Sequence, residues 1–298
     1  MNYRHVYHAG NFADVLKHLV LTLVIEHLKL KPQPFRVVDT HAGIGLYDLA
    51  SVEAGKTGEW RAGIARLLAR DLSPAAREVL APYISVVRPY LGSDLDAPGM
   101  KREYPGSPII ARDLMRSADA LVLNELHPED RAALETLFRR DKQTKVLGLD
   151  GYTVIKSALP PKERRGVLLV DPPFEEPGEF DRLISGMHDA YRRFAGGTQI
   201  LWYPVKDLPA VDRFRRQIAA DALAETLVVE IAVRDPRAAT PGLAATGVVV
   251  VNPPYTLHNK IAAVLPELLD AMASGSEASA GASYRLEWLV REKPAARS

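Results

Sequence analysis

The sequence predicts an α/β protein with a doubly wound, mostly parallel β-sheet of seven strands and a small helical insertion. Short apolar runs of strand length recur along the chain, as expected of strands covered on both faces. Helical segments separate several of these runs, and this alternation is typical of a parallel sheet. Between residues 51 and 104 the strand signals stop and Ala, Arg and Leu dominate, which indicates the insertion.

The predicted elements begin with an N-terminal helix. Residues 11–30 place apolar side chains at helical spacing, and Pro32 and Pro34 end this helix. A short buried strand then opens the segment 35–45 and runs into a glycine-rich turn. The other candidate strands are 120–126, 144–150, 166–173, 198–204, 226–233 and 247–254.

The insertion divides the predicted fold into two units. Residues 1–50 and 106–298 are expected to form one discontinuous α/β domain, and residues 51–105 the helical insertion subdomain. A chain of 298 residues is long enough for one large domain that carries such an insertion.

The composition is that of an ordinary globular protein, with 47% hydrophobic and 25% charged residues. The absence of cysteine excludes disulfides, thiolate metal sites and cysteine nucleophiles. The first residues do not form a signal peptide, and no stretch reaches the roughly 18 apolar residues of a spanning helix. We therefore expect a soluble, cytoplasmic protein. The net charge of +1 argues weakly against a nucleic-acid partner but can hide one basic face.

Polar residues follow each of the first four predicted strands. The first strand runs into the turn 39–45, whose glycines allow a close approach to a ligand. Glu125 ends the second strand, where an acidic residue can accept hydrogen bonds from a ribose diol. Asp150 and Gly151 end the third strand and could contact an adenine edge, and Asp171 ends the fourth. Because the carboxyl ends of parallel strands meet at one sheet edge, these residues are expected to form one site.

The tetrapeptide Asp171-Pro-Pro-Phe174 is the most specific of these signals. Asp/Asn-Pro-Pro-aromatic at this place is the signature of methyltransferases that act on the amino groups of nucleic-acid bases. The Asp171 carboxylate and the Pro172 carbonyl can each accept one N–H, which frees the nitrogen lone pair for the methyl group of S-adenosylmethionine (SAM). Phe174 can stack on the base. The alternative is a strand-ending turn with a core Phe.

Asn252-Pro-Pro-Tyr255 matches the same signature more literally. It follows the seventh candidate strand, away from a cofactor held by the first two strands. We therefore interpret this second motif as a structural turn.

The N-terminal segment is rich in histidine but does not predict a metal site. His5, His8 and His18 lack a neighbouring carboxylate pair and an H-E-x-x-H spacing, so no metal is expected. His18 could instead line the SAM pocket, and the alternative is an ordinary amphipathic helix with a ragged start. The residues expected to contact RNA here are Tyr3, Arg4 and Lys17.

A second helix start is predicted at 107–108. Ser107 is expected to be the N-cap, with Pro108 at the first helical position. A helix N-terminus attracts carboxylates, so Ser107 could also hold the methionine carboxylate of SAM. Three arginine pairs, 164–165, 192–193 and 215–216, could contact phosphates, although such pairs are more often solvated.

The chain resembles the 23S rRNA adenine-N6 methyltransferase J family over nearly its whole length. The resemblance is carried by HAGNFADVLKH (8–18), DTHAGIG (39–45), YPGSP (104–108), NELHP (124–128), the pair DG (150–151), DPPF (171–174), LWYPV (201–205) and the late NPP (252–254). The first two motifs together are highly specific. Members of this family carry Tyr where this chain has Phe174, so stacking is retained and any hydroxyl hydrogen bond is lost.

The resemblance implies a Rossmann-like SAM-dependent methyltransferase that acts as a monomer on one adenine of 23S rRNA. It implies that Asp171 is catalytic and that Tyr3 belongs to a mobile tail near the target base. The implied SAM contacts are His18, His41, Ser107, Glu125, Asp150, Gly151 and Asp171.

Two other functions remain open from the sequence. An adenine-N6 methyltransferase acting on DNA would share nearly all of these residues. A non-catalytic RNA-binding or assembly protein on a methyltransferase fold is the alternative of another class.

Overall fold

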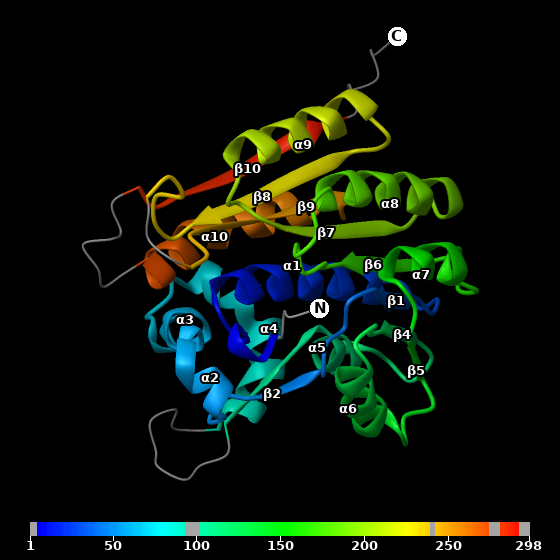
Figure 1. The fold of residues 1–298 in the computed structure, drawn as a ribbon, viewed down its shortest axis with the longest axis horizontal. Helices are drawn as coiled ribbons and strands as arrows, with labels where there is room; N and C mark the ends of the chain where they lie inside the picture. The colour runs from blue at the N-terminus through cyan, green and yellow to red at the C-terminus, as the bar shows by residue number, and fades with distance from the viewer. Residues whose placement is uncertain (1–4, 93–101, 239–241, 274–280, 292–298) are drawn as a thin grey trace.

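The computed structural model describes residues 5–92, 102–238, 242–273 and 281–291 and contains one large β-sheet (Figure 1). Its strands are β1 (Arg36–Asp39), β4 (Ala120–Asn124), β5 (Thr144–Leu147), β6 (Gly166–Val170), β7 (Thr198–Pro204), β8 (Thr226–Ala232), β9 (Ala245–Val251) and β10 (Ser283–Val290). They lie in the order β10-β8-β9-β7-β6-β1-β4-β5. The seven predicted strands are all present, and the α/β prediction is confirmed.

Strand direction divides the sheet into two parts. β5, β4, β1, β6 and β7 pair in parallel, as predicted. β9 lies between β7 and β8 and is antiparallel to both, and β10 is antiparallel to β8. Six strands therefore run one way and two run the other, so the carboxyl end of β9 lies at the amino edge of the parallel strands.

The strand β10 is an addition to the prediction. Its sequence, SYRLEWLV, alternates polar and apolar residues, and most of its side chains are exposed or half-buried. Only one face of this edge strand is covered by protein, so its sequence contains no continuous apolar run. The criterion of apolar runs therefore does not predict it.

Two helical layers cover the sheet, one on each face. One layer contains α1 (Phe12–Lys29), α5 (Ser107–Leu114), α6 (Pro128–Phe138) and α10 (Leu257–Ala273), and the other contains α7 (Gly151–Ala158), α8 (Glu179–Arg193) and α9 (Leu208–Asp221). Alternate strand residues enter the two cores: Val37 and Leu169 face the first layer, and Val38 and Leu168 the second. This two-sided burial explains the continuous apolar runs. Among the described residues, no helix is long and apolar enough to span a membrane.

Helix α1 begins where the sequence predicts. The Asn11 side chain caps it by accepting hydrogen bonds from the backbone N–H groups of Ala13 (2.9 Å) and Asp14 (3.0 Å). A short 3-10 helix, η1 (His5–Tyr7), precedes this cap. The cap fixes the direction of the first helical turn, which faces the carboxyl ends of the central strands.

The segment predicted as an insertion is largely helical. It contains α2 (Val52–Thr57), a π-helical turn η2 (Arg61–Ala65), α3 (Arg66–Ala69) and α4 (Pro74–Leu91), which gather beside the sheet in Figure 1. The short strands β2 (Leu46–Asp48) and β3 (Glu103–Pro105) pair antiparallel at its base. Because α4 packs on α1 and α10, the larger core is continuous across this segment. The division into two domains stays a prediction.

Candidate active site

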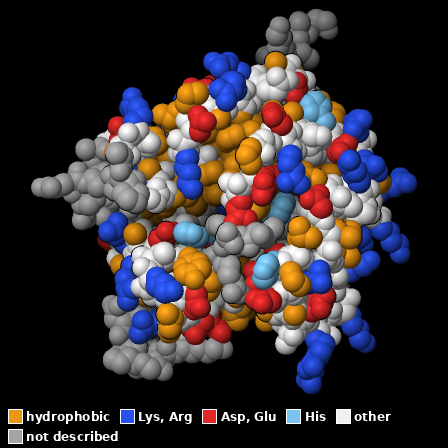
Figure 2. Space-filling view, viewed as in Figure 1, with side chains coloured by type: hydrophobic (Ala, Val, Ile, Leu, Met, Phe, Trp, Pro, Cys, Tyr) orange, Lys and Arg blue, Asp and Glu red, His pale blue; other side chains and the backbone are white. Residues whose placement is uncertain are grey.

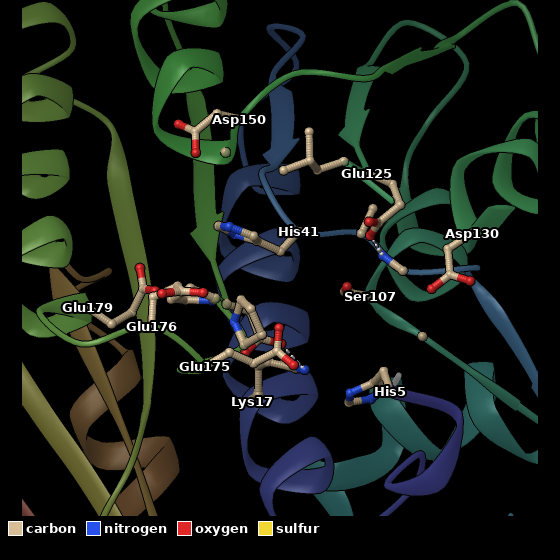
Figure 3. A pocket seen from close by; sticks show the side chains of 18 of the residues that line it. His5, Lys17, His41, Ser107, Glu125, Asp130, Asp150, Glu175, Glu176 and Glu179 are labelled. Carbon is tan, nitrogen blue, oxygen red and sulfur yellow. Dashed lines mark hydrogen bonds and ion pairs between the residues drawn. The ribbon is translucent and has the colours of Figure 1, made fainter. Parts of the chain in front are cut away.

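A cavity of about 320 Å³ opens at the carboxyl ends of β1, β4 and β6 (Figure 3). It brings together predicted residues that are far apart in the sequence. Those that line it are Lys17, His18, His41, Ser107, Glu125, Asp150, Gly151, Asp171 and Pro172. Phe174 lines a neighbouring cavity, and Tyr3 and Arg4 lie outside the described residues.

The turn after β1 forms the floor of this cavity. Asp39 is buried, and the Ser107 hydroxyl donates a hydrogen bond to its Oδ2 atom at 2.6 Å. Burial raises the pKa of Asp39 to about 6, although this hydrogen bond opposes the shift. Gly43 has φ +62°, and a Cβ atom there would lie 2.2 Å from the Tyr47 hydroxyl. Only glycine therefore fits at this point of the turn.

The prediction that Ser107 is a helix N-cap is wrong. Helix α5 begins at Ser107 itself, its N-cap is Gly106, and Pro108 is the second helical residue. Because the Ser107 hydroxyl donates to the buried Asp39 carboxylate, it fastens the start of α5 to the end of β1.

Glu125 lies directly after β4 and lines the first cavity. Its Oε2 atom accepts a hydrogen bond from the Gly43 backbone N–H at 2.9 Å, and its Oε1 atom accepts one from His127 N–H at 2.8 Å. Burial raises the pKa of this carboxyl group. These two bonds fix the carboxylate facing the cavity, and each oxygen keeps a lone pair for a ligand hydroxyl.

Asp150, at the upper side of the cavity in Figure 3, is the N-cap of α7, and Gly151 is the first residue of that helix. The Asp150 Oδ1 atom caps the helix, and its Oδ2 atom pairs with Arg182 at 2.8 Å. A Cβ atom on Gly151 would lie 2.5 Å from the His41 ring. Glycine is therefore required for the His41 side chain to occupy its place. Burial lowers the pKa of His41 to about 4, so the ring is neutral at pH 7.

Asp171 follows β6 and pairs with Lys17, which projects from α1 (Figure 3). Lys17 also donates a hydrogen bond to Asp14 at 2.9 Å and is only 5% exposed. Burial lowers the pKa of Lys17, but the two carboxylates outweigh it and raise the pKa. Lys17 was expected to contact RNA, whereas its ammonium group is enclosed by protein carboxylates.

A second cavity, of about 200 Å³, adjoins the first and shares Lys17, Asp171 and Pro173 with it. Phe174 forms part of its wall and has φ +52°, a left-handed conformation that is unusual for an aromatic residue. The Phe174 ring meets the Trp202 ring edge to face, with centroids 5.9 Å apart. Asp171 thus lies between a large polar cavity and a smaller one with aromatic walls.

His18 connects the first cavity to the insertion segment. Its Nδ1 atom lies 2.8 Å from the Tyr104 hydroxyl, which in turn lies 2.8 Å from the Tyr83 hydroxyl. Burial lowers the pKa of His18 to about 3, so it is neutral and its ring has a fixed hydrogen-bond partner.

Several residues of the two cavities were not singled out from the sequence for a role. They include Asp14, Tyr47, Asp130, Glu175, Glu176, Glu179, Arg182, Trp202 and Lys206. Trp202 and Lys206 follow no glycine-rich or proline-rich signal, and only the topology brings β7 beside β6.

The second proline motif lies at the opposite edge of the sheet. β9 is antiparallel to β7, with Val251 opposite Gln199, so Asn252 lies near the amino end of β7. The Asn252 backbone N–H donates to the Glu225 carbonyl at 2.8 Å, and the Thr198 hydroxyl donates to the Asn252 carbonyl at 2.9 Å. These bonds join three strand ends, consistent with a structural turn.

The basic pairs are partly engaged within the protein. Arg165 donates to the Leu28 carbonyl at 2.8 Å, Arg192 pairs with Asp189, and Arg215 pairs with Glu230 at 2.7 Å. Within the described ranges, the structure shows no group of three or more His, Cys, Asp or Glu side chains that could hold a metal ion.

The sheet order and the polar cavity at the carboxyl ends of its central strands define a Rossmann-like SAM-dependent methyltransferase. A family model described as "Ribosomal RNA large subunit methyltransferase D, RlmJ" matches residues 32–290. The chain belongs to this family.

Two bacterial relatives match the chain over nearly its full length. The chain is 42% identical over 292 residues to ribosomal RNA large subunit methyltransferase J of Escherichia coli K12, covering 98% of this chain and 100% of that protein. It is 40% identical over 294 residues to the protein of the same name in Haemophilus influenzae, again covering 98% and 100%. A crystal structure of a Legionella pneumophila protein superposes with a TM-score of 0.80 at 32% identity, covering 94% of this chain and 98% of that one.

Proposed function

We propose that this methyltransferase transfers a methyl group from SAM to N6 of one adenine in 23S rRNA, with Asp171 as the catalytic residue. The observation that carries the proposal is the position of Asp171 between the two cavities, with its Oδ2 atom held by Lys17. The names of the relatives supply the substrate class. We also propose that the enzyme acts in the cytoplasm as a monomer.

The first cavity has the features that SAM requires. Its volume of about 320 Å³ is within the range of small-molecule sites. Glu125 presents a fixed carboxylate for a ribose diol, and the neutral His41 ring and the α7 N-terminus offer polar contacts to an adenine edge. We assign SAM binding to His18, His41, Ser107, Glu125, Asp150, Gly151 and Asp171.

The second cavity suits the target base. Phe174 and Trp202 give it aromatic walls on which an adenine swung out of its helix can stack. The Asp171 carboxylate and the Pro172 carbonyl then accept the two N6 hydrogens. The nitrogen lone pair is then no longer delocalised into the ring and is free to attack the methyl group. SAM supplies the electrophilic methyl group when bound. The methylated nitrogen loses one proton, for which the Asp171 carboxylate is the nearest acceptor.

Two further contacts with RNA belong to the proposal. We assign these contacts to Tyr3 and Arg4, which directly precede His5 in the sequence, and His5 lines both cavities. Lys17 acts on the substrate through Asp171, because its ammonium group is buried.

Mass-spectrometric nucleoside mapping of 23S rRNA tests the function directly. A strain that lacks this gene should lose one N6-methyladenosine, and the wild-type gene should restore it whereas Asp171→Asn should not. The purified enzyme should methylate protein-free 23S rRNA in preference to duplex DNA. An unchanged rRNA map together with methylation of DNA would reject the rRNA substrate in favour of DNA.

A further inference from the structure

Asp14 is a buried carboxylate beside the catalytic centre that the proposed mechanism does not use. It is 2% exposed and lies in the first turn of α1. Its Oδ1 atom accepts a hydrogen bond from Lys17 Nζ at 2.9 Å. Its Oδ2 atom lies 2.9 Å from His5 Nε2 and accepts the Gly10 backbone N–H at 2.9 Å. One carboxylate thus connects the segment before α1 with the lysine that holds Asp171.

The three charges form an alternating row. The Lys17 ammonium lies between the carboxylates of Asp14 and Asp171, and all three groups are largely removed from water. A buried ammonium group needs compensating partners, and its position is set by all of them together. With Asp14 on one side, the ammonium binds a single oxygen of Asp171. In the described part of the chain, the hydrogen bonds of Asp171 leave its Oδ1 atom unengaged.

The geometry of the base site depends on that free oxygen. Accepting an N6 hydrogen requires a carboxylate oxygen that points into the second cavity with an available lone pair. Without Asp14, the Lys17 ammonium would be free to move toward Asp171 and bridge both of its oxygens. The carboxylate would then be a poorer and wrongly oriented acceptor for N6.

We propose that Asp14 is a positioning residue for methyl transfer: it fixes the Lys17 ammonium so that Asp171 keeps one oxygen free for the target amine. The inference rests on the proposed role of Asp171. A purely structural role would be to anchor the start of α1, since an acidic residue in the first turn also stabilises a helix.

Asp14→Asn, which keeps the size of the side chain, separates the two roles. Its kcat on 23S rRNA should fall about 10- to 100-fold, because a small displacement of a catalytic group has effects of this size. SAM affinity, measured by calorimetry, should change by less than about threefold, because the one SAM-assigned residue beside Asp14 is His18, whose neutral ring lies 3.9 Å from the Asp14 Oδ1 atom, beyond hydrogen-bond distance.

Asp119→Asn is the matched control. Asp119 is also 2% exposed, pairs with an arginine, Arg116, and accepts a backbone N–H, but it lies at the opposite edge of the sheet. The melting temperature of this variant should fall by about as much as that of Asp14→Asn. Its kcat should stay within about twofold of the wild type, since the site is left intact. Equal losses of kcat in the two variants would show that Asp14 acts only through stability and would overturn the inference.

A double-variant cycle tests the route through Lys17. If Asp14 acts through Lys17, single-turnover rates of Lys17→Gln and of Asp14→Asn/Lys17→Gln should agree within about twofold. Multiplying effects would overturn the inference. Asp171→Asn serves as the reference: an active Asp171→Asn would reject the proposed function itself. An inactive Asp171→Asn beside a fully active Asp14→Asn would reject only the role of Asp14.

Discussion

The two proline motifs of this chain, DPPF at 171–174 and NPPY at 252–255, end strands that are separated in the sheet only by β7. Each contains a residue with φ +52°, Phe174 in the first and Asn252 in the second. β6 runs parallel to β7, and β9 runs antiparallel to it. The first motif therefore faces the cavities, and the second lies at the opposite edge of the sheet.

The surroundings of the two motifs differ as much as their positions. The Asp171 side chain is paired with a buried lysine and lines both cavities. Asn252 is held by backbone and side-chain hydrogen bonds to residues at neighbouring strand ends, and Tyr255 is 81% exposed. Figure 2 shows acidic and histidine side chains around the middle of the visible face, and Lys and Arg along its right-hand margin. The same tetrapeptide pattern thus acquires its chemistry from strand direction and from the side chains that the fold brings to it.

The largest expected effect is that of Asp171→Asn. The amide oxygen can still accept a hydrogen bond, but it carries no charge for Lys17 to pair with and cannot take up a proton, so kcat should fall roughly 10²- to 10³-fold. Single-turnover transfer of a radiolabelled methyl group measures this loss. Circular dichroism should show an unchanged fold, and a rate equal to that of the wild type would exclude Asp171 as the catalytic residue.

Glu125→Gln should separate cofactor binding from chemistry at the same sheet edge. In the wild-type structure the Gly43 backbone N–H donates a hydrogen bond to the Glu125 carboxylate. The glutamine amide replaces this charged acceptor and presents N–H groups toward Gly43. A charge-assisted hydrogen bond contributes about 1.5–3 kcal/mol, so SAM should bind roughly 10- to 100-fold more weakly. Titration calorimetry measures the affinity. Unchanged binding would remove Glu125 from the SAM site.

Phe174→Ala and Tyr255→Ala compare the aromatic residues of the two motifs. Loss of base stacking costs about 1–3 kcal/mol, so Phe174→Ala should raise KM for 23S rRNA roughly 5- to 150-fold. Phe174→Tyr should keep the wild-type KM, because the ring remains. Tyr255→Ala should leave KM unchanged. Equal increases in the two alanine variants would mean that RNA contacts both sheet edges.

Two buried aspartates should give opposite pH dependences of stability. Burial raises the pKa of Asp39 to about 6, from an ordinary value of 3.8. Its stabilising contribution is therefore complete below about pH 4 and lost as the pH rises through about 6. Burial acts in the same direction on Asp119, but its hydrogen bonds and ion pair with Arg116 outweigh it and lower the pKa. Its contribution is therefore present above about pH 4 and lost as the pH falls.

Thermal melting of the two variants without SAM tests these signs. The stability of Asp39→Asn relative to the wild type should rise between about pH 4 and pH 7 by on the order of 3 kcal/mol, and its relative melting temperature should rise with it. The melting temperature of Asp119→Asn relative to the wild type should fall as the pH rises through the acidic range. Curves that stay parallel to the wild type would contradict the assigned burial of both groups.

The smallest expected effect is that of Asn252→Ala. Alanine is less tolerant of φ +52° than asparagine, which costs about 1 kcal/mol and lowers the melting temperature by roughly 2–4 °C. Methyl transfer should stay within about twofold of the wild type, since the site lies at the other edge. Complete inactivation with normal melting would assign catalysis to the second motif instead.

The sequence by itself determined the elements whose signal is local. Apolar runs revealed β1, β4 and β6 to β9, because burial on both faces leaves a continuous pattern, and the edge strand β5 was found although its residues are half-buried or exposed. The polar residues that end these strands could be assigned to one site because parallel strands share a carboxyl edge. DPPF identified Asp171 as the candidate catalytic residue, and the order of the motifs identified the family.

Only the tertiary structure decided which charges meet. Lys17 and Asp171 are 154 residues apart, and no spacing rule predicts an ion pair at that distance. Ser107 was predicted as a helix cap from its neighbours, but a buried carboxylate from another element is its actual partner. The edge strand β10 and the direction of β9 likewise depend on pairing between distant segments. Such contacts form only when the packed sheet brings remote side chains together in a space without water, where each must find a partner.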